Sequence, residues 1–173
     1  MKSTLAILVC LLIASAALAQ MPKAARADLQ PFIGTWDCKG TEFQSARGPE
    51  HATRTRLVND WVLGSEWVAI DARETKTKEN PNPLRVSVFL GFDKRTKKLV
   101  AAGFDKFGGY WTQEAPGWNG DTITFEGPNH VGEETMPLRD RFVKKSATEF
   151  VHTYDFEMNG EWKKLGDETC RKR

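Results

Sequence analysis

The chain lacks an excess of charge of either sign. Its 173 residues include 25 Lys and Arg against 23 Asp and Glu, which gives a formal net charge of +2 at pH 7. Nucleic-acid binding normally requires a concentrated basic face. A chain so close to neutrality does not favour that function, and we expect no nucleic-acid partner.

The chain also lacks the short motifs that mark common catalytic sites. It contains no G-x-S-x-G elbow, no G-x-x-x-x-G-K-[ST] loop, no G-x-G-x-x-G after a strand and no H-E-x-x-H pair. Its three histidines, His51, His130 and His152, are far apart and have no ligand-type spacing. We therefore expect no catalytic centre and no metal site.

Long hydrophobic runs are absent except at the start of the chain. Lys2 precedes the apolar run LAILVCLLIASAALA, and Ala17 and Ala19 are small residues at the positions that a signal peptidase reads. This run is short for a membrane span and no stop-transfer segment follows it. We interpret residues 1–19 as a cleaved signal peptide, with Gln20 first in a mature chain without a membrane span. The protein is then exported, to the periplasm or the outside of a bacterium.

Cysteine is scarce. Cys10 leaves with the signal peptide, so the mature chain keeps only Cys38 and Cys170. In an oxidising compartment such a pair predicts a disulfide, and this one would close almost the whole domain. The alternative is two unpaired thiols.

The mature chain has no long amphipathic helix that could cover a parallel sheet. A short helical segment is expected within 20–31, and 32–173 is expected to form one β-domain. Ten stretches have strand-like composition or alternation: 34–43, 52–60, 65–74, 84–92, 97–107, 109–115, 121–128, 137–145, 148–158 and 160–170. Turn signals such as Asn159-Gly160 separate them.

Nine or ten short strands predict an antiparallel sandwich or barrel. Cysteines on the first and last strands favour an up-and-down barrel, because closure makes those strands neighbours.

Alternation predicts which side chains face the interior. Phe150, His152, Tyr154, Phe156 and Met158 share one strand face, and the opposite face is far more polar. The first set should point inward. The same reasoning assigns an inward set to the segment 85–92, namely Val86, Val88, Leu90 and Phe92.

One short phrase occurs twice, as Gly91-Phe92-Asp93-Lys94 and as Gly103-Phe104-Asp105-Lys106. The interval of twelve residues equals one strand plus one turn, and Asp suits a turn at each strand end. Consecutive antiparallel strands end at opposite rims, so the two copies should not converge on one ligand. We interpret the repetition as the rhythm of a meander.

Several segments carry a family resemblance. The short helix before Gly34-Thr35-Trp36 resembles the opening of calycin barrels. LVNDWVLGSEWV, FLGFDKRTKKLVAAGFDKFGG, GWNGDTITFEG and the ending ETCRKR together resemble the DUF1579 family, over about 32–173. This resemblance implies a calycin-like barrel in a family of unknown function. It also implies a distant similarity to nitrobindin-like barrels, which bind haem through a histidine near the C-terminal strands.

These observations lead to three functional hypotheses. The first is a non-enzymatic barrel that holds a small hydrophobic molecule in its interior and needs no cofactor. The side chains expected to line that site are His152, Tyr154, Phe156, Phe150 and Trp67. The second is a haem-binding barrel with His152 as the ligand, although the last strand of this chain has no histidine. The third is a packed barrel whose outer surface meets a protein partner in the cell envelope. His152 and Tyr154 also have a purely structural interpretation, as core groups satisfied by neighbours.

Overall fold

A computed structural model describes residues 20–45 and 48–173. The proposed signal peptide, 1–19, lies outside the described residues. The N-terminal elements are helix α1, Lys23–Leu29, and a 3₁₀ turn η1, Gln30–Phe32. The strands that follow are β1 Gly34–Glu42, β2 His51–Val62, β3 Trp67–Glu74, β4 Arg85–Asp93, β5 Lys98–Asp105, β6 Tyr110–Ala115, β7 Thr122–Val131, β8 Glu134–Ser146, β9 Glu149–Met158 and β10 Glu161–Lys172.

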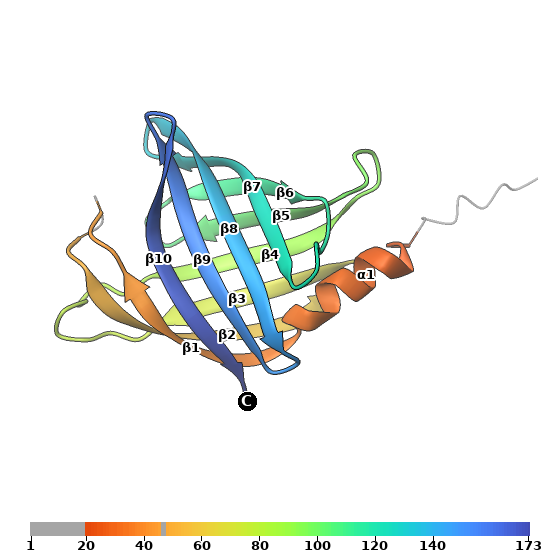
Figure 1. The fold of residues 1–173 in the computed structure, drawn as a ribbon, viewed down its shortest axis with the longest axis horizontal. Coiled ribbons are helices and arrows are strands. Elements are labelled where there is room, and N and C mark those ends of the chain that lie inside the picture. Colours follow the sequence, from red (N-terminus) through yellow and green to blue (C-terminus); the bar gives the residue numbers. More distant parts are fainter. Residues whose placement is uncertain (1–19, 46–47) are drawn as a thin grey trace, which may run out of the picture.

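The ten strands form one closed antiparallel barrel (Figure 1). Each strand pairs with its neighbour in sequence, and β1 pairs with β10 to close the sheet. The all-β meander predicted from strand spacing is therefore confirmed. Full closure removes the exposed sheet edges that would otherwise promote aggregation. No helix in 20–45 or 48–173 has the length and apolar character needed to cross a membrane.

A disulfide fastens the strand pair that closes the barrel. Cys38 and Cys170 are direct partners across β1 and β10, with their Cα atoms 3.9 Å apart, and they are bonded through their sulfur atoms. Both are buried. The predicted bridge is confirmed. Beside it, the guanidinium of Arg173 donates a hydrogen bond to the Asp37 carboxylate at 2.6 Å and holds the pKa of that carboxyl below its usual range.

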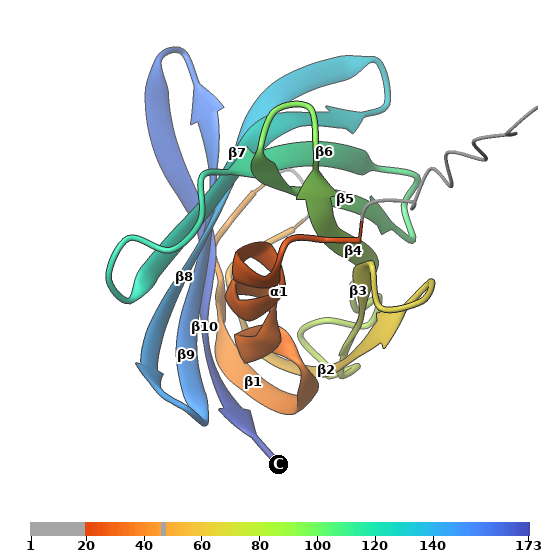
Figure 2. The same cartoon turned by 90° about the vertical axis from the view of Figure 1, so that its right-hand side faces the viewer.

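Helix α1 covers one end of the barrel (Figure 2). Ala25 and Leu29 are four residues apart, so they lie on one face of the helix. They pack with Phe32 into a buried cluster that includes Leu90 and Phe125 from the barrel wall. We call this end of the barrel the closed end. The short helix expected within 20–31 is confirmed, and its apolar face supplies the core of the closed end.

The barrel interior changes character along its axis. On β4, Leu90 is buried, and Val88 and Phe92 pack against the same cluster, as alternation predicted. On β9 and β10, Phe150 lies opposite Cys170 in an apolar cluster, whereas the next inward pair, His152 and Glu168, is polar. The disulfide layer therefore marks the boundary between an apolar half, near α1, and a polar half beyond it.

The two copies of the repeated phrase serve turns at opposite rims. The Asp93 carboxylate accepts the N–H of Arg95, and the Asp105 carboxylate accepts the N–H groups of Phe107 and Gly109. β4 ends at Asp93 and β5, which runs back antiparallel, ends at Asp105. The interpretation as a meander rhythm is confirmed.

Candidate functional site

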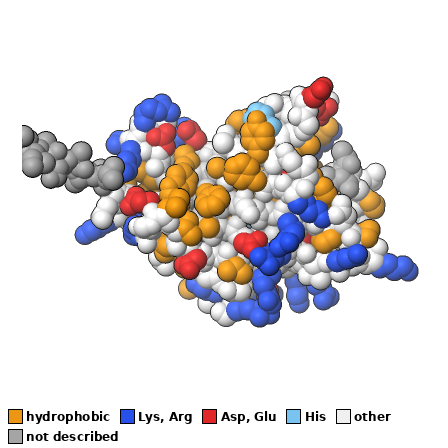
Figure 3. Space-filling model, turned by 180° about the vertical axis from the view of Figure 1, so that it is seen from behind, with side chains coloured by type: hydrophobic (Ala, Val, Ile, Leu, Met, Phe, Trp, Pro, Cys, Tyr) orange, Lys and Arg blue, Asp and Glu red, His pale blue; other side chains and the backbone are white. Residues whose placement is uncertain are grey.

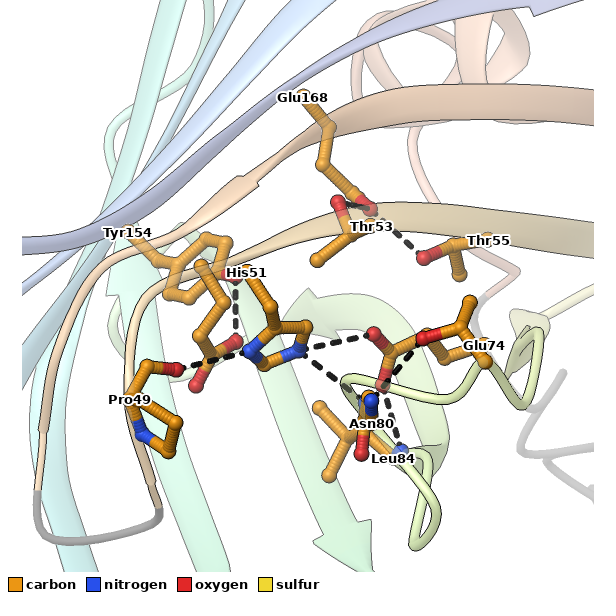
Figure 4. A network of polar contacts seen from close by, with 11 residues as sticks. Pro49, His51, Thr53, Thr55, Glu74, Asn80, Leu84, Tyr154 and Glu168 are labelled. Atoms are coloured by element: carbon orange, nitrogen blue, oxygen red, sulfur yellow. Dashed lines mark hydrogen bonds and ion pairs between the residues drawn. The ribbon is translucent and has the colours of Figure 1, made fainter.

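The candidate site is the polar half of the barrel interior. Its side chains come from strands that are distant in sequence but adjacent in the closed sheet: Glu42, His51, Thr53, Thr55, Glu74, Asp140, His152, Tyr154 and Glu168. Figure 4 shows several of them converging from β2, β9 and β10. Burying so many polar groups in a barrel is costly unless each has a partner, so their contacts define the site.

His152 is positioned by an acid and by an aromatic ring. Its Nε2 lies 2.8 Å from Oδ1 of Asp140, which places the ring proton on Nε2 because a carboxylate oxygen accepts. The amide of Gln113 donates to the other Asp140 oxygen at 2.6 Å. The imidazole stacks on Phe142 with centroids 4.3 Å apart and planes only 4° from parallel. These contacts fix both the orientation and the tautomer of His152.

The interior at this level remains in contact with solvent. The side chains of His152 and Asp140 are 20% and 18% exposed to solvent. In the apolar half, Trp36 and Phe125 are only 2% and 1% exposed. The polar pair is therefore held in place by the protein and still accessible to water.

Tyr154 reaches across the barrel to β1. Its hydroxyl donates a hydrogen bond to Oε2 of Glu42 at 2.9 Å (Figure 4). Its ring lies over Gly166, where a Cβ atom would stand 2.2 Å from the phenol oxygen. Only glycine at that position leaves room for the tyrosine. The rings of Tyr154 and His152 have centroids 5.3 Å apart, so they form one aromatic wall.

Glu168 is held by two hydroxyls. Thr53 and Thr55 both donate to its Oε1, at 3.1 and 2.6 Å. Its carboxylate also lies within 4.8 Å of the sulfur atoms of Cys38 and Cys170. Two thiolates and a carboxylate at such distances would suit a metal ion, but the disulfide occupies both sulfurs, which removes their capacity as ligands.

A second polar cluster lies nearer the rim. The Nδ1 of His51 lies 3.0 Å from the carbonyl oxygen of Pro49, and its Nε2 lies 3.3 Å from Glu74 and 3.1 Å from the Asn80 amide (Figure 4). Glu74 also accepts the backbone N–H of Leu84 at 2.7 Å. This cluster ties the 75–84 loop to the barrel wall.

Three acidic groups of the site, Glu74, Asp140 and Glu168, are paired with neutral donors or histidines. Within 20–45 and 48–173, no Lys or Arg forms an ion pair with Glu74, Asp140 or Glu168. The donors they receive are two threonine hydroxyls, an amide, a backbone N–H and two imidazoles. The polar half thus presents a lining rich in acceptors.

Four of the five side chains expected to line the interior do so. Phe150 packs at the disulfide layer, His152 and Tyr154 belong to the polar half, and Phe156 lies opposite Leu138 nearer the rim. These locations agree with the alternation of β9. Their role in binding a ligand stays a prediction.

The expectation for Trp67 is wrong. Val68, its neighbour, is fully buried opposite Leu90, so Trp67 points to the outer face. There its ring covers Gly91, whose added Cβ would stand 2.5 Å from the indole. Trp67 lines an outer groove of about 470 Å³ together with Val100 and Pro128. Figure 3 shows hydrophobic side chains gathered on this outer face.

The acidic surroundings of His152 do not favour haem, and the haem hypothesis stays a prediction. The Nε2 atom of His152 is held by Asp140 and one face of its imidazole is covered by Phe142, so Nδ1 is the ring nitrogen that an iron would have to reach. The neighbouring groups include the carboxylates of Asp140 and Glu168, which would repel the propionates of a haem. We therefore assign no step to this cofactor.

Sequence reasoning did not identify Glu42, Asp140 and Glu168 as site residues. A signal for them exists, because each lies an even number of residues, two or four, from an inward-facing residue of its own strand, and alternate residues of a strand share a face. Glu168 shares a face with Cys170, Glu42 shares a face with Cys38, and Asp140 shares a face with Phe142. Applying strand parity outward from the disulfide would have placed Glu42 and Glu168 inside, whereas Asp140 requires the register between β8 and β9.

Comparison with known proteins gives a family and a fold. The family model described as "Protein of unknown function (DUF1579)" matches residues 21–172. The crystal structure of Rv2717c from M. tuberculosis is similar with a TM-score of 0.66 at 11% sequence identity, covering 89% of this chain and 99% of that one. At this identity the likeness concerns the fold alone. No curated protein matches the chain.

Proposed function

The chain belongs to the DUF1579 family, and from that premise we propose that it is an exported barrel that binds one small molecule in its polar half. The molecule is mainly apolar and carries a hydrogen-bond-donating end, such as an amine. Its apolar body lies against the aromatic wall of Tyr154 and His152 and against Phe156, and its donor faces the carboxylate of Asp140.

One observation carries this proposal: His152 and Asp140 are ordered by protein contacts yet keep about a fifth of their surface exposed inside a barrel. A barrel that only needed to fold would gain more from apolar side chains at these positions, because desolvating polar groups opposes folding. Preorganised polar groups on a rigid scaffold, next to apolar walls, are typical of small-molecule sites.

The chemistry of the lining supports a donor rather than an acceptor on the ligand. Asp140 and Glu168 offer carboxylate oxygens, and their partners are neutral donors or histidine. A cationic or N–H-bearing group entering here gains a charge-assisted hydrogen bond. Burial of ~150 Å² of apolar surface would add about 4 kcal/mol at ~25 cal/mol per Å². The aromatic wall thus supplies affinity, and the acid supplies orientation.

Export is part of the proposal. The disulfide between Cys38 and Cys170 fits an oxidising compartment. The apolar N-terminal run and its small residues at 17 and 19 support cleavage before Gln20. N-terminal sequencing of the protein recovered from its own host is the direct measurement, and we expect Gln20 as the first residue.

Two probes of equal shape and opposite charge test the binding site. We expect titration calorimetry to detect phenylethylamine and to show at least tenfold weaker binding of phenylacetate. Asp140→Asn keeps the side-chain shape and removes the charge, and we expect it to weaken phenylethylamine about tenfold, because a hydrogen bond to a charged group is worth about 1.5–3 kcal/mol. Glu157→Gln is the matched control, since Glu157 lies on the outer face of β9 opposite Trp162.

The proposal fails if Asp140→Asn and Glu157→Gln bind the amine equally well, or if the wild-type protein prefers phenylacetate. Native mass spectrometry of the protein from its host adds an independent readout, because a bound passenger that leaves in Asp140→Asn identifies the natural ligand class.

A further inference from the structure

A second concave surface lies outside the barrel, at the closed end. It has a volume of about 490 Å³ and lies between η1, the end of β8 and the end of β10. Three lysines, Lys144, Lys145 and Lys172, line it together with the aromatic residues Phe32, Trp36 and Trp118. We call it the lysine groove. Its volume lies within the range of small-molecule sites, ~300–1,000 Å³.

The aromatic floor of the lysine groove is fixed by hydrogen bonds. The indole N–H of Trp36 donates to the carbonyl of Phe32 at 3.0 Å, and that of Trp118 donates to the carbonyl of Asp28 at 2.8 Å. The rings of Phe32 and Trp118 stack with centroids 5.8 Å apart. Phe32 and Trp36 are each only 2% exposed, so the apolar surface open to a ligand comes from Trp118, Ala27 and Pro31.

The lysines lie over this floor without a carboxylate partner. Lys144 Nζ is 4.0 Å from the centroid of Trp118, and Lys172 Nζ is 5.4 Å from that of Trp36. Among the described residues, neither these two nor Lys145 forms an ion pair. An ammonium over an aromatic ring keeps its charge available to an anion that enters the groove.

The acidic residues nearby do not cancel this charge. Glu149 lines the groove but is paired with Arg171 at 2.7 Å. Asp28 lies under the loop of Trp118, and burial raises the pKa of its carboxyl, with Lys144 acting in the opposite direction. Asp121 is the remaining acidic side chain of the lining. Three lysines against these groups leave an excess of positive charge.

From this arrangement we infer that the lysine groove binds a free amphipathic organic anion, an aromatic or aliphatic carboxylate or sulfonate. The apolar body lies on Ala27, Pro31 and the exposed edge of Trp118, and the anionic group meets the ammonium groups of Lys144 and Lys172. This site differs from the polar half in both place and charge preference. The rings of Phe32 and Phe142, 5.1 Å apart, lie between the two sites.

Two dyes that differ in a single sulfonate test the inference. Anilinonaphthalenesulfonate carries the anion, and phenylnaphthylamine has the same rings without it. We expect the sulfonate to bind at least about tenfold more tightly in low salt, and this advantage to shrink at ~1 M salt, where charges are screened within about 3 Å. The measurement is fluorescence titration of the full mature protein.

Lysine variants test which side chains give the sulfonate dye its higher affinity. We expect the double variant Lys144→Gln with Lys172→Gln to lose about tenfold in sulfonate affinity and to leave phenylnaphthylamine unchanged. Lys94→Gln is the matched control, because Lys94 is an exposed lysine of the β4–β5 turn. Asp140→Asn should leave sulfonate binding unchanged, which separates the groove from the barrel interior. Thermal melting of each variant checks that the fold is retained.

Three results would overturn the inference. The first is equal affinity for the two dyes, and the second is an equal response of the double lysine variant and Lys94→Gln. The third is co-sedimentation with anionic phosphatidylglycerol vesicles that the double lysine variant loses, because the groove would then serve a membrane surface. None of these outcomes depends on whether phenylethylamine binds in the polar half.

Discussion

The two ends of the barrel both combine aromatic rings with charged side chains, but the charges have opposite sign. In the polar half, aromatic rings stand beside carboxylates, as with Tyr154 and Glu42. In the lysine groove, aromatic rings stand beside ammonium groups, as with Trp118 and Lys144. An aromatic and apolar layer around Phe32 and Phe142 separates them. Both proposed sites place an aromatic surface beside charged groups, and they differ in the sign of that charge.

The largest expected effect comes from opening the strand pair at the boundary of the two halves. Replacing Cys38 and Cys170 by Ala removes a bridge that spans 132 residues. Chain entropy assigns a loop of this order about 4.7 kcal/mol, less any strain, so we expect the free energy of unfolding to fall by about 4 kcal/mol in guanidinium titrations. Amide hydrogen exchange should rise more around Glu168 than in α1. Equal exchange at both ends would show that the bridge stabilises the two halves to the same extent.

An intermediate effect is expected from Gly166→Ala. The new Cβ would stand 2.2 Å from the Tyr154 oxygen and 2.9 Å from the carbonyl oxygen of Thr41, so the tyrosine must move. We expect a loss of about 2 kcal/mol in the free energy of unfolding and loss of phenylethylamine binding, with sulfonate binding unchanged.

A second substitution separates stability from binding at this position. Adding Tyr154→Leu to Gly166→Ala removes the phenol atoms that the Cβ would meet but leaves the carbonyl oxygen of Thr41 at 2.9 Å, so we expect stability to recover in part while amine binding stays lost. Recovery of both would mean that the tyrosine is not part of the site.

The smallest effect concerns the charge beneath the lysine groove. Burial raises the pKa of Asp28 above its ordinary value of 3.8. A carboxyl with a raised pKa in the folded protein favours the fold below its unfolded pKa, and this contribution is lost as the pH rises through the folded value. Asp28→Asn should therefore stabilise the protein at pH 7, by well under about 1 kcal/mol because solvent screens the group. Sulfonate affinity should rise about twofold.

Asp93→Asn provides a comparison of opposite sign. The backbone N–H of Arg95 lowers the pKa of Asp93, so its ionised form favours the fold above the unfolded pKa and this contribution is lost as the pH falls. Denaturant midpoints measured between pH 3 and 7 should move in opposite directions for the two variants. A common direction would contradict the assignment for Asp28.

Much of the fold could be predicted because its signals are local. The turn chemistry of Asp93 and Asp105 and the alternation of β9 act over a few residues. The disulfide then supplied the one long-range constraint, which selected a closed barrel. The prediction that Trp67 faces the interior was wrong because Trp67 and its neighbour Val68 are both apolar, so the sequence allowed either one to face the core. Packing of Val68 against Leu90 decided the parity, and no short segment contains that information.

The site could be predicted only in part because its polar network is not local. The parity of β9 identified His152 and Tyr154, but their partners Asp140 and Glu42 come from β8 and β1. Register between strands brings them together, and register becomes known only when the barrel closes. The lysine groove has the same character, since Lys144 and Trp118 meet through the packing of the β6–β7 loop beside β8.

Two-dimensional NMR of the labelled mature protein with both probes tests the central claim most directly. We predict that phenylethylamine shifts the resonances of His152 and Tyr154 and leaves the indole N–H signals of Trp36 and Trp118 in place, and that anilinonaphthalenesulfonate does the reverse. Both probes together should give the sum of the two patterns. A single common set of shifted resonances, or displacement of one probe by the other, would contradict the existence of two sites with opposite charge preference.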